Sequence, residues 1–329
     1  MRTLGIGGPA VSDLGLGCMG MSDFYGPAER SESIATIHAA LDAGITLLDT
    51  GDFYGMGHNE LLIEEALRGR SRDDVRISVK FGSQRDADGD WLGFDGRPAA
   101  VKTSLAYTLQ RLGTDYVDVY RMARVDPAVP IEETVGAIAE EVAKGRVRHI
   151  GLSEAGAESV RRAHAVHPIA DVQLEYSLLS RGIEREILPA CRELGVGVTA
   201  YGVLSRGLLS GRWSKDRELA AGDFRAFSPR FSGENLEHNL ALVAALGALA
   251  DAKGIPLAQL AIAWVLSRGD HIVPLIGARR RDRLAEALGA LDVTLTAEDL
   301  TRIEAAVPAG AAAGSRYAES QMAHLDSER

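Results

Sequence analysis

The chain has 329 residues, of which 46% are apolar and 25% charged; this is ordinary for a folded protein and long enough for one α/β barrel. Its formal net charge of −10 argues against a nucleic-acid partner, which would need a basic face. Only Cys18 and Cys191 occur, with no histidine cluster and no apolar run of signal-peptide or membrane-span type, so we expect a cytoplasmic protein without a metal or a membrane partner.

Short β-branched or apolar runs alternate with longer helical patterns along the whole chain, which predicts parallel strands joined by helices. The eight predicted strands are Leu14–Cys18, Thr46–Asp49, Val75–Lys80, Val117–Met122, His149–Ser153, Asp171–Glu175, Gly197–Tyr201 and Ile272–Gly277. Helices are predicted near 29–43, 58–68, 98–112, 131–145, 156–166, 184–194, 239–252, 256–268, 280–289 and 297–306. This order predicts one (β/α)8 TIM barrel as a single domain over residues 1–329.

Several segments lie outside this repeat. Residues 1–11 are rich in glycine, and we expect them to form a short N-terminal hairpin that caps the barrel. Residues 83–97 and 205–236 are expected to be long irregular loops at the C-terminal face, and long loops in a compact domain usually carry function. The Ala/Gly-rich residues 308–314 predict a linker at the start of a C-terminal tail, 308–329.

A doubly wound open sheet is the main alternative fold. It would need a glycine-rich phosphate-binding turn after the first strand. Leu14–Gly20 contains glycines, but not in the GxGxxG order, so this signal is weak. No shift in composition marks a second domain, and the barrel is therefore the favoured interpretation.

Polar side chains follow several predicted strands at their C-terminal ends, where a barrel places its active site. Asp49, Lys80 and the nearby Tyr54 form the most informative set. An ammonium beside a phenol lowers the phenol's pKa, and a carboxylate would keep the ammonium charged. Tyr54 could then act as a general acid in carbonyl reduction. The alternative is a buried Asp–Lys ion pair between two strands, beside an ordinary core tyrosine.

Four segments resemble segments of the aldo-keto reductases, in the family's order: Asp49–Glu60, Asp118–Pro127, Gly145–Glu154 and Ala200–Leu208. The resemblance covers about residues 10–306. It implies a (β/α)8 barrel that binds NADPH without a Rossmann domain and reduces a small-molecule aldehyde or ketone. It also implies that Asp49, Tyr54 and Lys80 are the catalytic residues.

The resemblance also assigns the residues that hold the nicotinamide. Ser153 and Gln173 would bind its carboxamide, and the Tyr201 ring would stack on the base. The family has Asn where this chain has Glu154, which puts one carboxamide contact in doubt. As alternatives, Ser153 could cap a strand end and Gln173 could be a hydrogen-bonding residue of the barrel interior.

An arginine cluster opens the helix after the last predicted strand. In the family this turn binds the 2′-phosphate of the cofactor, so Arg279, Arg280 and Arg283 indicate NADP(H) rather than NAD(H). The alternative is a solvated charged face. Ala287 stands where the family often has an Asn near the adenine. The other cofactor-binding residues implied by the resemblance are Gly20, Met21, Asp49, Gly202, Leu204, Ser205, Arg206, Gly207, Gly277 and Glu286.

Ala123 occupies the position where the family carries its catalytic histidine. Among the histidines, His58 is nearest in sequence to the site loop, although it is expected to begin a helix. Arg121 and Arg124 flank the position, and strand alternation favours Arg121 as the neighbour on the same face.

Two functions follow from the missing histidine. The first is a slow or specialised reductase, favoured because Asp49, Tyr54 and Lys80 are all retained. The second is an NADPH-binding sensor or regulatory protein with little or no turnover. Aromatic residues of the predicted loops would either line a substrate pocket or pack the loops: Phe24, Tyr25, Trp91, Trp213 and Phe227.

Overall fold

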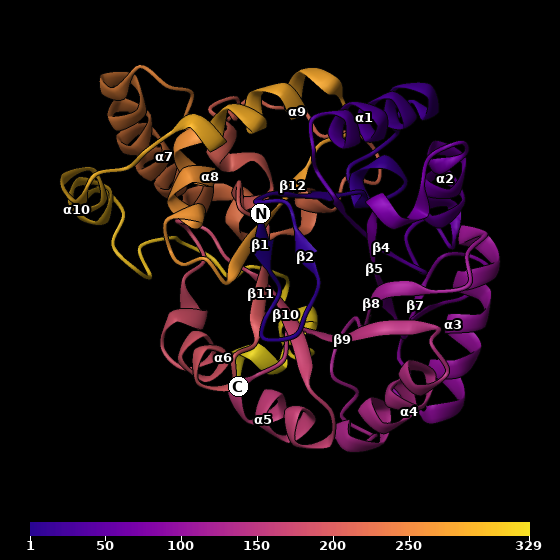
Figure 1. The fold of residues 1–329 in the computed structure, drawn as a ribbon. Coiled ribbons are helices and arrows are strands. Elements are labelled where there is room, and N and C mark those ends of the chain that lie inside the picture. Colours follow the sequence, from indigo (N-terminus) through magenta and orange to yellow (C-terminus); the bar gives the residue numbers. More distant parts are fainter.

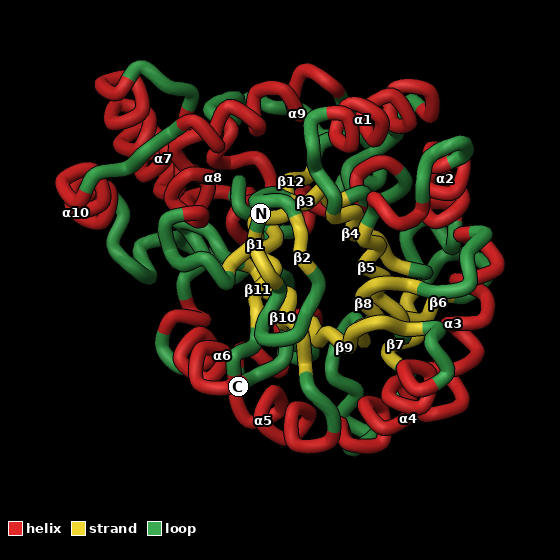
Figure 2. The backbone as a smooth tube through the Cα atoms, viewed as in Figure 1, coloured by secondary structure: helices red, strands yellow, loops and turns green.

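Eight parallel strands pair edge to edge into a closed ring in the computed structural model, which describes residues 1–329 (Figures 1 and 2). In chain order they are β3 (Gly15–Gly17), β4 (Leu47–Gly51), β5 (Arg76–Phe81), β8 (Val117–Met122), β9 (Val147–Ser153), β10 (Ile169–Glu175), β11 (Gly197–Tyr201) and β12 (Ile272–Gly277). The ring closes where Leu275 and Ile276 of β12 pair with Gly15 and Leu16 of β3. This closure confirms the predicted (β/α)8 barrel and excludes the open sheet.

Helices surround the ring, as Figure 2 shows. They are α1 (Arg30–Asp42), α2 (His58–Leu67), α3 (Pro98–Leu112), α4 (Ile131–Ala143), α5 (Ala157–Val166), α6 (Ile187–Leu194), α7 (Gly233–Lys253), α8 (Leu257–Leu266), α9 (Arg281–Leu288), α10 (Ala297–Ala306) and the short α11 (Glu319–Met322). The predicted helices are all present, but α7 begins at Gly233, before the predicted start at 239. No single helix is both long and apolar enough to cross a membrane; α7 and α8 meet the two conditions only when taken together, and the chain bends by 91° between them.

Burial on both faces explains why the strands are mainly apolar and show no strict alternation of polar and apolar residues. Every residue of β4, β8 and β10 is buried, because one face packs on the helices and the other fills the barrel. The barrel interior also holds polar residues: Arg121 of β8 pairs with Asp171 of β10 at 3.0 Å and donates to the hydroxyl of Ser78 at 2.8 Å.

The N-terminal residues form the expected short hairpin. β1 (Arg2–Thr3) pairs antiparallel with β2 (Ala10–Val11), and in Figure 1 the pair lies in front of the barrel opening. Arg2 donates to the carbonyls of Gly269 and Ile272, just before and at the start of β12, so the hairpin covers the end of the barrel at which the strands begin. The opposite end, at the carboxyl ends of the strands, carries the candidate site.

The two segments that were predicted to be long irregular loops contain short regular elements. Residues 83–97 contain a hairpin, in which β6 (Ser83–Arg85) pairs with β7 (Trp91–Phe94), so the prediction of a wholly irregular loop was wrong here. The backbone N–H of Asp86 donates to the carbonyl of Asp90 and closes the turn between them. Residues 205–232 contain three short 3-10 turns, at Ser205–Ser210, Phe224–Phe227 and Pro229–Phe231, joined by irregular backbone, and α7 follows from Gly233.

The C-terminal segment packs against the barrel. Residues 308–314 are fixed by Asn239, whose amide donates to the carbonyl of Ala313 and accepts from its N–H at 2.9 and 2.8 Å. Arg316 and Leu325 are buried, and Asp326 accepts from the N–H of Gly156 at 2.7 Å. Residues 308–314 thus connect α10 to the C-terminal tail as an ordered segment bonded to α7, and the tail is bonded to the start of α5.

Candidate active site

Three ionisable residues meet at the carboxyl ends of β4 and β5. The ammonium of Lys80 donates to Asp49 at 2.5 Å and to the carbonyl of Thr50 at 3.1 Å. Asp49 also accepts from Ser78 at 3.0 Å and from the amide of Gln173 at 2.8 Å. The parallel register, in which Asp49 lies opposite Ser78 and Gly51 opposite Lys80, brings these side chains to one level of the barrel.

Tyr54 joins this group from the turn after β4. Its N–H donates to the carbonyl of Gly51, and its ring centroid lies 5.2 Å from the Lys80 nitrogen. The turn then passes through three residues with positive φ, at Gly55 (56°), Met56 (53°) and Gly57 (93°). This tight reversal, in which two glycines remove most of the strain, lets Tyr54 fold back over the strand ends. The structure thus brings Asp49, Tyr54 and Lys80 together.

The electrostatics of Tyr54 differ from the sequence expectation. Burial and the neighbouring Asp49 raise the pKa of Tyr54 well above its ordinary value, although Arg124 acts in the opposite direction. Burial also lowers the pKa of Lys80, and the ion pair with Asp49 opposes that effect. The carboxylate offsets the charge of the ammonium, so Lys80 does not produce the expected acidic phenol. Tyr54 therefore stays protonated at neutral pH, which is the state that a proton donor requires.

Ala123 lies directly after β8, with its N–H bonded to the carbonyl of Phe81 at 2.8 Å and only 2% of its surface exposed. His58 does not replace the missing imidazole, because it is exposed at the start of α2 and contacts Ser22 at 2.8 Å. Arg121 was the favoured neighbour, but it is fully buried inside the barrel and bound to Asp171. Arg124, just beyond the strand, is the arginine at the mouth.

The residues expected to hold the nicotinamide lie on adjacent strands. Gln173 of β10 is opposite Ser153 of β9, and Glu175 of β10 is opposite Tyr201 of β11. Tyr201 is partly exposed at the mouth. The amide of Gln173 donates to Asp49 at 2.8 Å, which links the residues expected to hold the carboxamide to the Tyr54 group.

Glu154 stands where the family has an Asn that contacts the carboxamide, but here its carboxylate is bound by residues of the chain itself. Its carboxylate accepts from the N–H of Glu175 at 2.9 Å, from the Tyr201 hydroxyl at 2.8 Å and from Arg316 at 2.7 Å. Burial alone would raise the pKa of Glu154, but the Arg316 guanidinium outweighs it and holds that pKa far below its usual value. The carboxylate is therefore a buried anion that binds the C-terminal segment.

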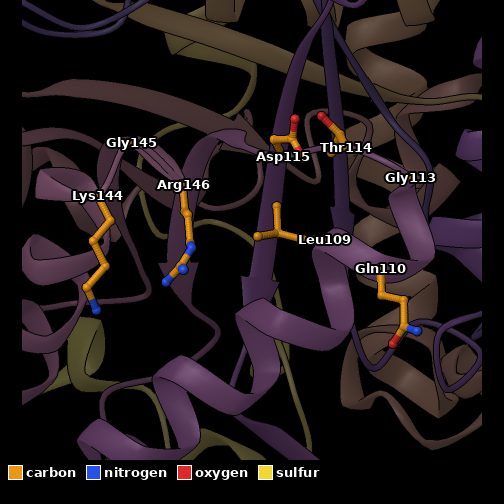
Figure 3. Close-up of a pocket in the computed structure, with 8 residues that line it drawn as sticks. All are labelled: Leu109, Gln110, Gly113, Thr114, Asp115, Lys144, Gly145 and Arg146. Carbon is orange, nitrogen blue, oxygen red and sulfur yellow. The ribbon is translucent and has the colours of Figure 1, made fainter.

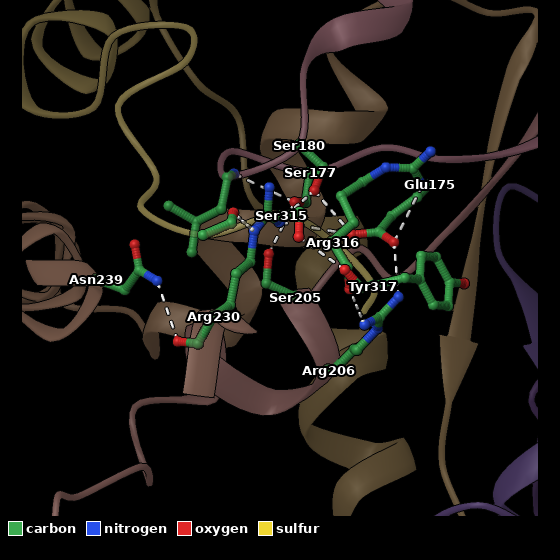
Figure 4. Close-up of polar contacts among 12 residues, drawn as sticks. Glu175, Ser177, Ser180, Ser205, Arg206, Arg230, Asn239, Ser315, Arg316 and Tyr317 are labelled. Carbon is green, nitrogen blue, oxygen red and sulfur yellow. Dashed lines mark hydrogen bonds and ion pairs between the residues drawn. The ribbon is translucent and has the colours of Figure 1, made fainter. Parts of the chain in front are cut away.

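Glu175 anchors a second part of the same network, drawn in Figure 4. It accepts from Arg206 at 3.0 Å, from Arg316 at 3.2 Å and from Ser180 at 2.8 Å. Arg206 was expected near the cofactor, but its guanidinium is bound here and lies 4.0 Å from the centroid of the Tyr317 ring. We call Glu154, Glu175, Arg206, Arg316 and Tyr317 the C-terminal cluster.

The C-terminal cluster was missed by the sequence analysis. Tyr317 reaches the site directly, since its hydroxyl lies 2.9 Å from that of Tyr201. The only sequence signal was an Arg–Tyr pair, Arg316 and Tyr317, directly after a run of alanine and glycine.

Two of the three predicted phosphate-binding arginines, Arg279 and Arg280, border a cavity of about 700 Å³, and Arg283 lies outside its lining. Its lining consists of Pro27, Ala28, Glu29, Glu32, Arg279, Arg280, Arg281 and Asp282. Arg280 pairs with Asp282 at 3.0 Å and Arg281 with Glu32 at 2.9 Å, whereas Arg279 donates to backbone carbonyls of residues 25–27. A cavity beside the first turn of α9, with one guanidinium free of carboxylates, fits the phosphate end of a nucleotide.

The remaining predicted cofactor residues lie at or after the ends of β3, β11 and β12. Arg283 is 3.6 Å from Asp282, and Glu286 is bound by both guanidinium nitrogens of Arg212 at 2.8 Å. Ser205 is buried against Ser177 at 2.9 Å. Gly20 and Met21 follow β3, Gly277 ends β12, and Gly202, Leu204 and Gly207 lie in the turn after β11.

Aromatic side chains surround Tyr54 on its outer side. Phe24 lies 6.1 Å from it and stacks on Trp91 at 6.2 Å, and Phe53, which the sequence analysis did not single out, lies 4.8 Å away. Tyr25 contacts this group only through Phe224. The ring centroid of Phe224 lies 5.2 Å from that of Tyr25 and 6.1 Å from that of Phe24. Of the other expected aromatics, Trp213 packs on Phe231 at 4.6 Å and Phe227 is 78% exposed.

A second cavity, of about 560 Å³, is drawn in Figure 3. It lies between the end of α3 and the end of α4, where Gly113, Thr114 and Asp115 face Lys144 and Arg146. These residues precede β8 and β9, so the cavity is at the end of the barrel where the strands begin. It takes no part in the candidate site.

Comparisons with known proteins bear on the family and the fold of the chain. Residues 13–308 match the protein family described as the aldo/keto reductase family. The chain is 42% identical over 315 residues to a probable aldo-keto reductase 1 of Glycine max, covering 95% of this chain and 90% of that protein.

Two solved structures are similar in fold. A glycerol dehydrogenase from Gluconobacter oxydans superposes with a TM-score of 0.84 and 29% identity, covering 93% of this chain and 94% of the other. A thermostable aldo-keto reductase, solved with the inhibitor epalrestat, superposes with a TM-score of 0.74 and 29% identity, covering 93% of this chain and 98% of the other.

Proposed function

Since this chain belongs to the aldo-keto reductase family, we propose that it is an oxidoreductase that uses NADPH to reduce an aldehyde or a ketone. The observation that carries this proposal is the group of Asp49, Tyr54 and Lys80 at the carboxyl ends of β4 and β5, beside a mouth lined by the predicted nucleotide residues. A barrel presents its chemistry at this end.

NADPH would be held by residues on both sides of the mouth. Ser153 and Gln173 would bind the carboxamide, Tyr201 would stack on the ring, and Arg279 and Arg283 would meet the 2′-phosphate. When bound, the reduced nicotinamide would supply a hydride to the carbonyl carbon.

Tyr54 would give its proton to the carbonyl oxygen and afterwards regain a proton from solvent. Its raised pKa keeps the phenol protonated before the reaction. Lys80, fixed by Asp49, would hold the Tyr54 ring in place, 5.2 Å from its centroid. Phe24, Phe53 and Trp91 would form the apolar wall that receives the rest of the substrate.

The cofactor preference can be measured by fluorescence titration with NADPH and NADH. We expect NADPH to bind more tightly, because each charge-assisted bond from Arg279 or Arg283 to a phosphate contributes about 1.5–3 kcal/mol. Arg283→Ala should weaken NADPH binding and leave NADH binding unchanged, whereas Arg302→Ala, on the exposed side of α10, should change neither. Equal affinity for both cofactors in the wild-type protein would contradict the assignment.

Ala123 favours a second candidate function, an NADPH-binding sensor or regulatory protein with little turnover, because it offers no hydrogen-bond donor to a substrate. Mixing the NADPH complex with a panel of aldehydes, ketones and quinones distinguishes the two. The enzyme is expected to oxidise bound NADPH with at least one of them. Tight binding without any oxidation would support the sensor instead.

A further inference from the structure

Arg124 is a positively charged side chain at the barrel mouth that forms no ion pair. It follows Ala123 immediately after β8, and one of its nitrogens donates to the Ala123 carbonyl at 2.6 Å. No carboxylate oxygen lies within 4.0 Å of its guanidinium. Arg121, three residues earlier, is by contrast bound to Asp171 inside the barrel. The remaining N–H groups of Arg124 are therefore free for another partner.

The guanidinium of Arg124 lies among the tyrosines of the mouth. Its central carbon is 5.9 Å from the centroid of the Tyr317 ring, and the Tyr317 hydroxyl is 2.9 Å from that of Tyr201. Its charge also reaches Tyr54: burial and Asp49 raise the pKa of that phenol, and Arg124 is the main influence that lowers it. The backbone fixes the same neighbourhood: Ala123, the residue before Arg124, donates its N–H to the carbonyl of Phe81, the residue after Lys80, so Arg124 leaves β8 beside the end of β5 that carries Lys80.

Other donors around Tyr54 are already engaged. The Lys80 ammonium bonds to Asp49 and to a backbone carbonyl, and the Gln173 amide bonds to Asp49. Arg316 faces two buried carboxylates. A carbonyl oxygen gains negative charge as a hydride reaches its carbon, and preorganised donors aimed at that oxygen lower the barrier. Arg124 is the cation of this group whose hydrogens are available.

We propose that Arg124 is a catalytic residue that binds the carbonyl oxygen of the substrate and stabilises the negative charge that develops there. This role rests on the proposed function. In the step, the hydride bonds to the carbonyl carbon, the C=O π pair moves to the oxygen, and the O–H bond of Tyr54 breaks to protonate it. Arg124 keeps all of its protons and contributes charge and hydrogen bonds only.

The test is the rate of single-turnover oxidation of bound NADPH in Arg124→Met, which retains much of the side-chain length without the donors. Loss of one such donor lowers the rate by about 10²–10³-fold. We expect this loss in the hydride-transfer rate and no change in NADPH affinity. Arg124→Lys, which keeps the charge without the fork, should be intermediate. The control Arg148→Met removes an exposed arginine that stacks on Tyr116 at the opposite end of the barrel, and should react at the wild-type rate.

A rescue experiment separates this role from a structural one. Adding Ala123→His to Arg124→Met supplies a new donor at the neighbouring position, and should restore the rate by about tenfold or more. The same change in the wild-type protein should add less, because a donor is already present. A structural role for Arg124 would instead lower the melting temperature and NADPH affinity, with no rescue.

Two outcomes would overturn the proposal, and they are distinguishable. If Arg124→Met oxidises NADPH at the wild-type rate, Arg124 has no catalytic role although the enzyme is active. If the wild-type protein itself binds NADPH but transfers no hydride to any carbonyl compound, the proposed function fails, and the role of Arg124 fails with it.

Discussion

Replacement of Tyr54 by Phe is expected to lower the rate of carbonyl reduction by about 10²–10⁴-fold, the usual contribution of a positioned general acid. The substitution removes only the hydroxyl, so the ring should keep its contacts with Phe24 and Phe53. NADPH affinity should be unchanged, because no predicted cofactor contact involves that hydroxyl. The measurement is single-turnover NADPH oxidation together with a fluorescence titration.

Tyr116→Phe is the matched control. Its hydroxyl contacts Asp73 at 3.3 Å before β8, at the end of the barrel away from the mouth, and its loss should leave the rate unchanged. Wild-type turnover in Tyr54→Phe would mean that another acid or water supplies the proton.

Reduction and alcohol oxidation should differ in how their rates depend on pH. Since burial and Asp49 raise the pKa of Tyr54, the phenol is protonated across the neutral range. We expect the rate of reduction to be flat between about pH 6 and about pH 9, and the rate of alcohol oxidation, which needs the deprotonated form, to rise with pH. A reduction rate that falls steeply through pH 7 would indicate a different acid.

Replacement of Arg316 by Met is expected to destabilise the fold by about 3–5 kcal/mol, the usual cost of removing one partner from a buried ion pair. The substitution leaves Glu154 and Glu175 buried with fewer positive neighbours, and it releases the contact with Glu328. Denaturant unfolding at pH 7 gives the free energy directly.

A second substitution tests the mechanism of that loss. If the stranded carboxylate is the cause, Arg316→Met combined with Glu154→Gln should be more stable than Arg316→Met alone. Equal stabilities would show that Arg316 acts mainly through packing.

The pH dependence of the Arg316 effect has a definite sign. In the wild-type protein Arg316, outweighing burial, holds the pKa of Glu154 below the ordinary 4.5, so this stabilisation is present above pH 4.5 and is lost as the pH falls further. In Arg316→Met the Glu154 pKa rises, and protonation relieves the buried charge at a higher pH. The difference in stability between the two proteins should therefore shrink as the pH falls from 7.

The strands and helices of the barrel could be predicted because their signals are local. β12 is an apolar run, and β8 is a mainly apolar one that also contains Asp118 and Arg121; the bounds predicted for both match the structure. The hairpin within residues 83–97 was not predicted, since β6 and β7 are only three and four residues long and have no apolar alternation.

The C-terminal cluster could not be predicted because its contacts are distant in sequence. Arg316 reaches Glu154 across 162 residues and Glu175 across 141. Neither carboxylate has a neighbour in sequence that indicates its partner.

The roles of Arg121 and Arg124 show a limit of the alternation rule. Alternation correctly places Arg121 inside the barrel, but its guanidinium is bound there to Asp171 and Ser78 and is fully buried. β8 ends at Met122, and beyond a strand end alternation no longer specifies direction. Arg124 therefore reaches the mouth from a position that the rule does not cover.

The most direct test of the central claim is a single-turnover experiment with the NADPH complex of the wild-type protein and of Tyr54→Phe. Each complex is mixed with an excess of an aldehyde that the wild-type protein accepts, and NADPH absorbance is followed. We expect the wild-type complex to lose its NADPH signal in one phase and the Tyr54→Phe complex to lose it about 10²–10⁴-fold more slowly. Equal rates in the two complexes, or no loss of NADPH in either, would contradict the account.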